Sequence, residues 1–168
     1  MKTIIEQVTA WPFLDTLPAE YAGFTLDKEL VESGTQYLIF SYRKPREQRS
    51  FSVLYDQATK DFMGLITVGL TEYFDVTFIC TDLGGLERIL TERMTRTLER
   101  LAGDDSYESI FRAKKILEWE HSKELPRELA GFTLFISPER PIRTINGSYI
   151  ILDYSDFQEE SNLILYYN

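Results

Sequence analysis

Cys80 and His121 are the only cysteine and the only histidine in this chain, and they form its single conventional pair of nucleophile and base. A catalytic role would require the fold to bring the thiol within hydrogen-bonding distance of the imidazole. Cys80 ends a predicted strand and His121 lies near a predicted helix end, so the pattern is compatible with such contact. Strand cysteines are, however, often buried for packing alone. We therefore favour a structural cysteine and a solvent-facing histidine.

A glycine-containing loop at residues 81–85 (TDLGG) joins a predicted strand to a predicted helix, where phosphate-binding loops occur. The loop lacks the Walker lysine and the Gly-x-Gly-x-x-Gly spacing, and the carboxylate of Asp82 would repel an anion. We expect instead that Thr81 or Asp82 caps the following helix and that the glycines allow close packing.

Metal binding finds little support, because one cysteine and one histidine cannot make a zinc set and no calcium-loop spacing occurs. We therefore expect no metal and no cofactor. Carboxylates for acid–base chemistry are present, but glycosidase-type catalysis needs two that face each other across a cleft. Glu20 and Glu128 each follow a Leu-Pro pair, which predicts first-turn or capping residues. The other candidates are Glu118, Glu120 and Glu124.

The elements that would position these side chains are organised by an internal repeat. Residues 17–26 read LPAEYAGFTL and residues 125–134 read LPRELAGFTL, so eight of ten positions are identical. At the same offset of 108, Trp11 matches Trp119, the only other tryptophan. After four extra residues in the second copy, residues 37–42 match 149–154 and residues 51–56 match 163–168. The sequence therefore predicts a duplication.

The predicted elements follow hydrophobic periodicity and turn residues. Helices are expected at residues 2–11, stopped by Pro12, at 86–101, and at 105–119, capped by Asp105 and Glu108. Strands are expected at 24–26, 36–43, 50–56, 63–70 and 75–80, with a turn at Thr71–Glu72, and again at the second-copy positions. The order is α-β-β-β-β-β-α, then α-β-β-β. This indicates an α+β fold with helices packed on antiparallel sheet.

We expect the first repeat, with two additional strands and a helix, to cover residues 1–104, and the shorter second repeat to cover 105–168, both within one compact globular unit. On the second strand, Leu38, Phe40 and Tyr42 alternate with Tyr37, Ile39 and Ser41. The position of Ser41 is taken by Asp153 in the second copy, so the face of Leu38 is predicted to be the core.

The hairpins after the matching second strands have equal lengths and opposite charges. Residues 43–49 carry a net charge of +3 and residues 155–161 a net charge of −3. Such charges suit a head-to-tail contact between copies or between molecules, while the alternative is drift on two exposed loops. The charged candidates for binding are Arg43, Lys44, Arg46 and Arg49 in the first hairpin and Asp156, Glu159 and Glu160 in the second.

The last strand is apolar on both faces, yet the strands that follow its counterpart in the first copy are missing here. An uncovered edge of this kind pairs readily with another chain. We predict that the strand is buried, either beside a strand of the first copy or in a homodimer interface. The interface residues are expected to be Leu163, Leu165, Tyr166 and Tyr167.

Composition narrows the classes of partner and location that fit this chain. A hydrophobic content of 43%, 27% charged residues and a formal net charge of −9 are typical of a soluble globular protein and argue against nucleic acid as a partner. No stretch reads as a membrane span or a signal peptide. With one cysteine, no intrachain disulfide can form, which favours the cytoplasm.

Together these features predict a non-enzymatic interaction or regulatory protein that self-associates or binds a basic protein partner. The alternative is a small-ligand binder or hydrolase with a cleft between the repeats, lined by Tyr37, Tyr149 and nearby carboxylates.

Overall fold

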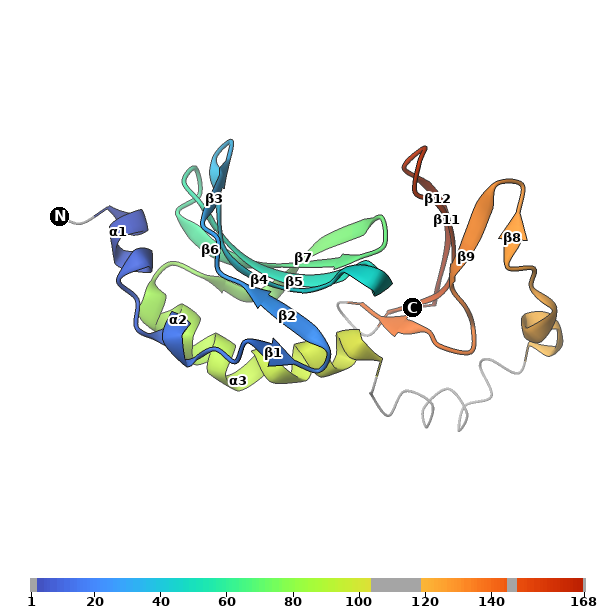
Figure 1. Cartoon of the computed structure of the whole chain (residues 1–168), viewed down its shortest axis with the longest axis horizontal. Helices are drawn as coiled ribbons and strands as arrows, with labels where there is room; N and C mark the ends of the chain where they lie inside the picture. Colours follow the sequence, from blue (N-terminus) through green and yellow to red (C-terminus); the bar gives the residue numbers. More distant parts are fainter. Residues whose placement is uncertain (1–2, 104–118, 145–147, 168) are drawn as a thin grey trace. The chain divides into compact units, whose positions relative to one another are not determined.

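A computed structural model describes residues 3–103, 119–144 and 148–167 of the chain. The chain divides into two compact units, residues 1–98 and 99–168, which are described separately below. Both contain antiparallel sheets, and the first adds helices, so the predicted α+β class is confirmed (Figure 1). The helix expected at 105–119, with Asp105 and Glu108 as its capping box, lies outside the described residues except for its last residue.

Two short helices open unit 1. Helix α1 (Ile4–Thr9) begins at a capping box, in which the Thr3 hydroxyl accepts from the backbone N–H of Glu6 and the Glu6 carboxylate accepts from that of Thr3. The helix predicted to stop at Pro12 is followed directly by α2 (Phe13–Thr16). Pro12 is the first residue before that helix, where a missing N–H costs nothing, so the proline separates two helices.

The sheet of unit 1 has seven strands, all paired antiparallel. Its order is β1-β2-β4-β5-β6-β7, with β3 paired to part of β4. The bounds are β1 (Glu20–Tyr21), β2 (Phe24–Asp27), β3 (Val31–Ser33), β4 (Gln36–Lys44), β5 (Arg49–Asp56), β6 (Asp61–Val68) and β7 (Thr71–Cys80), with the 3-10 turn η1 (Pro45–Glu47) between β4 and β5.

Helix α3 (Leu83–Ala102) runs along one face of this sheet (Figure 1). Its buried side chains recur every three or four residues, as an amphipathic helix requires. The apolar ones are Leu86, Leu90, Met94, Leu98 and Leu101, and Thr97 is buried as well. The sheet contributes fully buried aromatic residues, among them Phe40, Tyr42 and Phe51, so the core of unit 1 is largely aromatic on the sheet side.

The prediction that one face of β4 is core and the other exposed is wrong for the middle of the strand. Phe40 and Tyr42 are fully buried as expected, but Ile39 and Ser41 are buried too, and Leu38 is only half-buried. A β-bulge accounts for the burial of Ile39, because the register with β5 shifts between Leu38 and Phe40 and leaves Ile39 as the extra residue.

Unit 2 contains the short 3-10 helix η2 (Glu120–Glu124) and a five-stranded antiparallel sheet. The strands are β8 (Glu128–Leu129), β9 (Phe132–Ile136), β10 (Ile142–Arg143), β11 (Tyr149–Asp156) and β12 (Ser161–Tyr167). The long strand β11 pairs with β9 and β10 along one edge and with β12 along the other.

The structure has more strands than the sequence predicted. The additional ones, β1, β3, β8 and β10, have only two or three residues, too few to show an alternating pattern. The turn expected at Thr71–Glu72 also lies two residues earlier, at Gly69 with a φ of +60°, and Thr71 is already in β7. Glycine adopts this left-handed conformation without strain.

Candidate functional site

The two sheets have matching strand registers over their first parts. In unit 1, Leu26 pairs with Tyr42, and in unit 2 Leu134 pairs with Tyr154. Between the following strands, Tyr37 pairs with Tyr55 and Tyr149 pairs with Tyr167. The β-bulge at Ile39 also has a counterpart, because the β11–β12 register shifts between Ile150 and Leu152. The strands β1, β2, β4 and β5 therefore correspond in pairing to β8, β9, β11 and β12.

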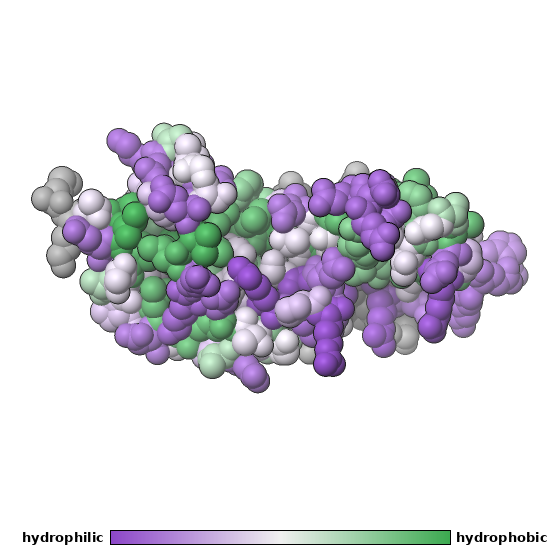
Figure 2. Space-filling view, turned by 45° about the horizontal axis from the view of Figure 1, so that its top comes forward, coloured by the Kyte–Doolittle hydropathy of each residue, from purple (hydrophilic) through white to green (hydrophobic). Residues whose placement is uncertain are grey.

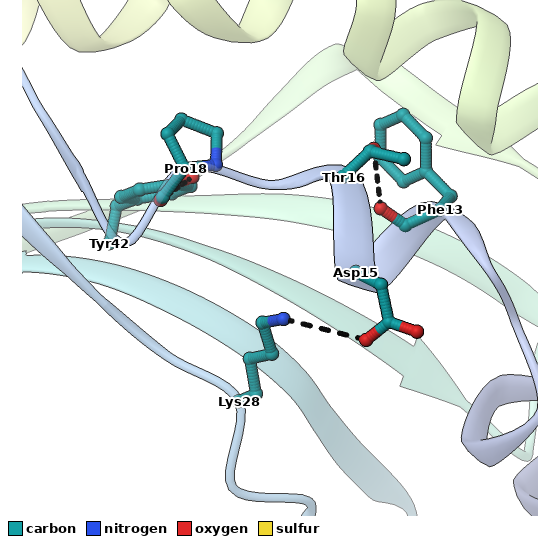
Figure 3. Close-up of polar contacts among 6 residues, drawn as sticks. All are labelled: Phe13, Asp15, Thr16, Pro18, Lys28 and Tyr42. Carbon is teal, nitrogen blue, oxygen red and sulfur yellow. Dashed lines mark hydrogen bonds and ion pairs between the residues drawn. The ribbon is translucent and has the colours of Figure 1, made fainter.

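Side chains and turns follow the same correspondence. The Tyr42 hydroxyl donates to the carbonyl oxygen of Pro18 at 2.8 Å, and the Tyr154 hydroxyl donates to that of Pro126 at 2.6 Å. Figure 3 shows the first contact beside helix α2, where the Thr16 hydroxyl donates to the Phe13 carbonyl. Burial raises the pKa of Tyr42 to about 12. Left-handed backbone conformations also recur at Ala22 and Ala130, Gly23 and Gly131, and Gln48 and Glu160.

The sheets differ in what lies beyond β5 and β12. Strand β5 pairs with β6 along its whole length, whereas β12 pairs with β11 alone among the described residues. The consequence is large: Leu163 is 62% exposed, whereas Phe51, at the matching position of β5, is fully buried. The strand predicted to be buried is therefore exposed in this single chain. The other predicted interface residues, Leu165, Tyr166 and Tyr167, are exposed as well.

The basic hairpin of unit 1 holds most of its cations in local ion pairs. Lys44 Nζ lies 2.7 Å and Arg49 Nη1 lies 3.6 Å from carboxylate oxygens of Glu47, and Arg43 contacts Asp27 at 3.5 Å. Arg46 is exposed at the tip. Because one glutamate serves two cations, a positive charge remains at this hairpin.

The acidic hairpin of unit 2 is arranged differently. The Asp156 carboxylate accepts from the backbone N–H groups of Gln158 at 2.9 Å and Glu159 at 3.2 Å, which fixes the turn. Glu159 and Glu160 are exposed. The turn therefore presents two carboxylates to solvent directly before β12. Sequence reasoning identified these charges but not the structural role of Asp156.

Asp153 in β11 carries a buried carboxylate. Its Oδ1 accepts from the Ser155 hydroxyl at 2.8 Å, but its Oδ2 has no hydrogen-bond partner among the described atoms. Burial raises the pKa of Asp153, and the Ser155 hydroxyl partly offsets this. At the matching position of unit 1, Ser41 accepts from Nε of Arg43 at 2.8 Å. The only sequence signal was an acid within an apolar strand.

The two tryptophans do not share an environment, which contradicts the equivalence expected from the repeat. Trp11 is 7% exposed, stacks on Phe13 at 4.9 Å and donates its indole N–H to Glu87 at 3.0 Å. Trp119 is 42% exposed. The reason is that Glu87 belongs to α3, and the described part of unit 2 contains no matching helix.

Cys80 and His121 each have a local contact. The Cys80 thiol lies 3.7 Å from the carbonyl oxygen of Asp82, and burial raises the pKa of this thiol. A catalytic cysteine needs the opposite shift, because the thiolate is the nucleophile. His121 Nδ1 lies 2.9 Å from a carboxylate oxygen of Glu124. These contacts fit the structural roles better than catalysis.

The loop at residues 81–85 is a helix cap. The Asp82 carboxylate accepts from the backbone N–H of Gly85 at 2.8 Å, at the position where a bound phosphate would accept. Glu20 and Glu128 are exposed and begin the short strands β1 and β8, so the expected first-turn or capping role is wrong.

The features of a ligand site are weak. Tyr37 donates to Glu32 within its own hairpin at 3.1 Å, and Tyr149 is buried. Two surface depressions lie on the outer faces of single helices, one on α3 and one at α1 and Ala10. Within the described residues, no group of three or more His, Cys, Asp or Glu side chains is placed to hold a metal ion.

Among the residues described, no helix is long and apolar enough to cross a membrane.

Of the surfaces described above, the edge strand β12 with its acidic hairpin has the clearest capacity to bind a partner. Comparisons of the chain with protein-family models, with curated proteins and with solved structures gave no match.

Proposed function

We propose that this chain is a non-enzymatic protein-interaction module, whose contact surface is strand β12 with the acidic hairpin before it. The observation that carries the proposal is the open edge of β12, with exposed Leu163 and Leu165 on one face and exposed Tyr166 on the other. An edge strand offers unpaired backbone N–H and C=O groups, so a partner strand gains hydrogen bonds and apolar burial together. Figure 2 shows hydrophobic surface gathered in patches between charged residues, including one over unit 2.

An origin by duplication accounts for this open edge. The matching registers, the two tyrosine–proline hydrogen bonds and the paired left-handed residues support two copies of one antiparallel-strand unit. The first copy continues into β6, β7 and α3, which cover its β5. Among the described residues only β11 pairs with β12, so β12 lacks the cover that β5 receives.

The charges support a partner that is either another copy of this chain or a basic protein. Glu159 and Glu160 are exposed beside the open strand, and the chain carries a net charge of −9 in a setting that we expect to be cytoplasmic. Opposite charges accelerate encounter and fix orientation more than they increase affinity. The apolar strand would supply most of the free energy of binding.

Two measurements on the full chain test the proposal. Light scattering at increasing protein concentration reports self-association. Fluorescence anisotropy of a labelled alternating Lys-Val peptide, which is extended and basic, reports binding of a partner strand. We expect association in at least one of them. A chain that stays monomeric and binds no Lys-Val peptide would refute the module.

Two double variants with the same change in net charge distinguish the effect of charges beside β12 from the effect of the overall charge of the chain. Glu159→Gln with Glu160→Gln removes two charges beside β12, and Glu29→Gln with Glu92→Gln removes two exposed charges from unit 1. The first pair should weaken binding of the Lys-Val peptide, with a smaller salt dependence, and the second should leave it unchanged. An alternating Glu-Val peptide serves as the control ligand. Equal effects of both variant pairs would show that only net charge matters.

A further inference from the structure

Strand β12 has a composition that lets it pair with itself. None of its seven residues is charged and none is proline. Natural edge strands are usually protected from pairing by lysine, proline or a bulge, and β12 has none of the three. The irregular register between β11 and β12 does not put a bulge on β12, because the extra residue, Ile151, belongs to β11. A second copy of the same strand can therefore approach without like charges meeting.

Strand β7, an outer edge of the unit 1 sheet, is protected. Glu72 and Asp75 place two carboxylates on the strand. The register with β6 also shifts strongly, since Phe62 pairs with Cys80 but Gly64 pairs with Asp75. The intervening residues of β7 form a large bulge, which interrupts the row of backbone groups that a partner strand would need. The exposure of apolar side chains alone does not distinguish β12 from β7, because Val76 on β7 is 60% exposed.

We propose that two copies of this chain form a symmetric dimer by antiparallel pairing of β12 with β12, centred on Ile164. This inference rests on the proposed function and names the partner. In an antiparallel pair related by a two-fold axis, Ile164 lies opposite Ile164 of the second copy, and Leu163 lies opposite Leu165 of the second copy. The exposed leucines of both copies then form one four-residue apolar cluster on one face of a continuous ten-stranded sheet.

The positions of the acidic hairpins are compatible with this arrangement. The acidic hairpin adjoins the first residue of β12, because Asp156 pairs with Ser161. At the other end of β12, Arg143 lies two strands away on β10, because Tyr167 pairs with Tyr149 and Tyr149 pairs with Arg143. Antiparallel pairing brings Ser161 of one copy opposite Tyr167 of the other. Each acidic hairpin therefore lies at the Tyr167 end of the other copy's β12, and the two acidic hairpins stay a strand length apart.

Two lysine substitutions test the edge. Leu163→Lys places a charge in the proposed leucine cluster, and Val76→Lys makes the same change at an equally exposed position on β7. By light scattering, the parent chain should have twice the mass of 19.6 kDa. Leu163→Lys should raise the dimer Kd by at least about tenfold, and Val76→Lys should not change it. Loss of the dimer in Val76→Lys alone would overturn the inference and assign the interface to β7.

A cysteine pair tests the register. In a Cys80→Ser background, Ile164→Cys should give a disulfide-linked dimer under mild oxidation, because directly opposed residues have the separation a disulfide needs. Asn162→Cys should not, since residue 162 faces Tyr166 of the other copy. Circular dichroism of each variant checks that the fold is kept. Crosslinking of Asn162→Cys but not Ile164→Cys would overturn the proposed register.

The outcome also separates this inference from the function on which it rests. A chain that is monomeric at every concentration but binds the Lys-Val peptide would overturn the dimer and leave the interaction module standing. A chain that neither dimerises nor binds the peptide would overturn both.

Discussion

The hydroxyl of Tyr154 donates a hydrogen bond to the carbonyl oxygen of Pro126 at 2.6 Å, across 28 residues of sequence. It ties the long strand β11 to the segment that leads into β8. Tyr42 makes the same bond to Pro18 in unit 1. A tyrosine of this kind fixes the entry of the strand β8 or β1 relative to the sheet, because the carbonyl before a short strand has no ladder partner of its own.

Removal of either hydroxyl should lower stability by a similar amount. Tyr42→Phe and Tyr154→Phe each keep the ring and leave a carbonyl oxygen without its donor, at an expected cost of about 1 kcal/mol. Thermal unfolding followed by circular dichroism measures the effect. Tyr55→Phe, at a partly exposed position of β5, is the control and should change little. A loss confined to Tyr42→Phe would show that the two bonds are not energetically equivalent.

Asp153→Asn should stabilise the chain at neutral pH. The buried carboxylate has an unpaired oxygen and a raised pKa, so the folded state binds its proton more tightly than the unfolded state does. Its destabilising effect therefore grows as pH rises from the ordinary value of about 4 through the raised value. We expect a gain on the order of 1 kcal/mol at pH 7 that disappears near pH 4.

Chemical denaturation at several pH values measures this difference. Glu159→Gln removes an exposed carboxylate from the same unit and should show no such pH dependence. A gain from Asp153→Asn that is equal at pH 4 and pH 7 would show that packing, not ionisation, is responsible.

Asp82→Ala should destabilise helix α3. The substitution removes the acceptor for the Gly85 N–H, and loss of an N-cap side chain typically costs about 1 kcal/mol. Asp82→Asn retains an oxygen acceptor and should recover most of the loss. Urea unfolding measures both variants, and equal destabilisation by alanine and asparagine would contradict the capping role.

The tryptophans should respond differently to a soluble quencher. Trp11 is buried and bonded to Glu87, whereas Trp119 is partly exposed. In Trp119→Phe, the remaining fluorescence should be shielded from acrylamide, and in Trp11→Phe it should be readily quenched. Similar quenching constants would indicate similar surroundings and would contradict the structure.

The sequence allowed the long strands and α3 to be predicted, because each has enough residues for its periodicity to show. Short strands such as β3 were missed for the opposite reason. The burial of Ile39 could not be predicted, since a β-bulge depends on how β4 pairs with β5, and pairing is not visible in one strand.

The site was predicted in part. The charges of the acidic hairpin could be read from the sequence, whereas the unpaired edge of β12 is seen only in the strand pairing of the described residues. The charge of the basic hairpin was read correctly, but the sharing of Glu47 by Lys44 and Arg49 depends on the turn geometry of η1. The unpaired oxygen of Asp153 was beyond sequence reasoning, because satisfaction of a buried group depends on its neighbours in space.

The missing neighbour of β12 has a consequence for how the chain behaves while it is being produced. Any extended, uncharged polypeptide that reaches this strand before the intended occupant can add to it, including unfolded copies of the same sequence. The yield of soluble folded protein should therefore decline as the rate of synthesis rises. A partner strand bound to β12 should protect the chain from precipitation.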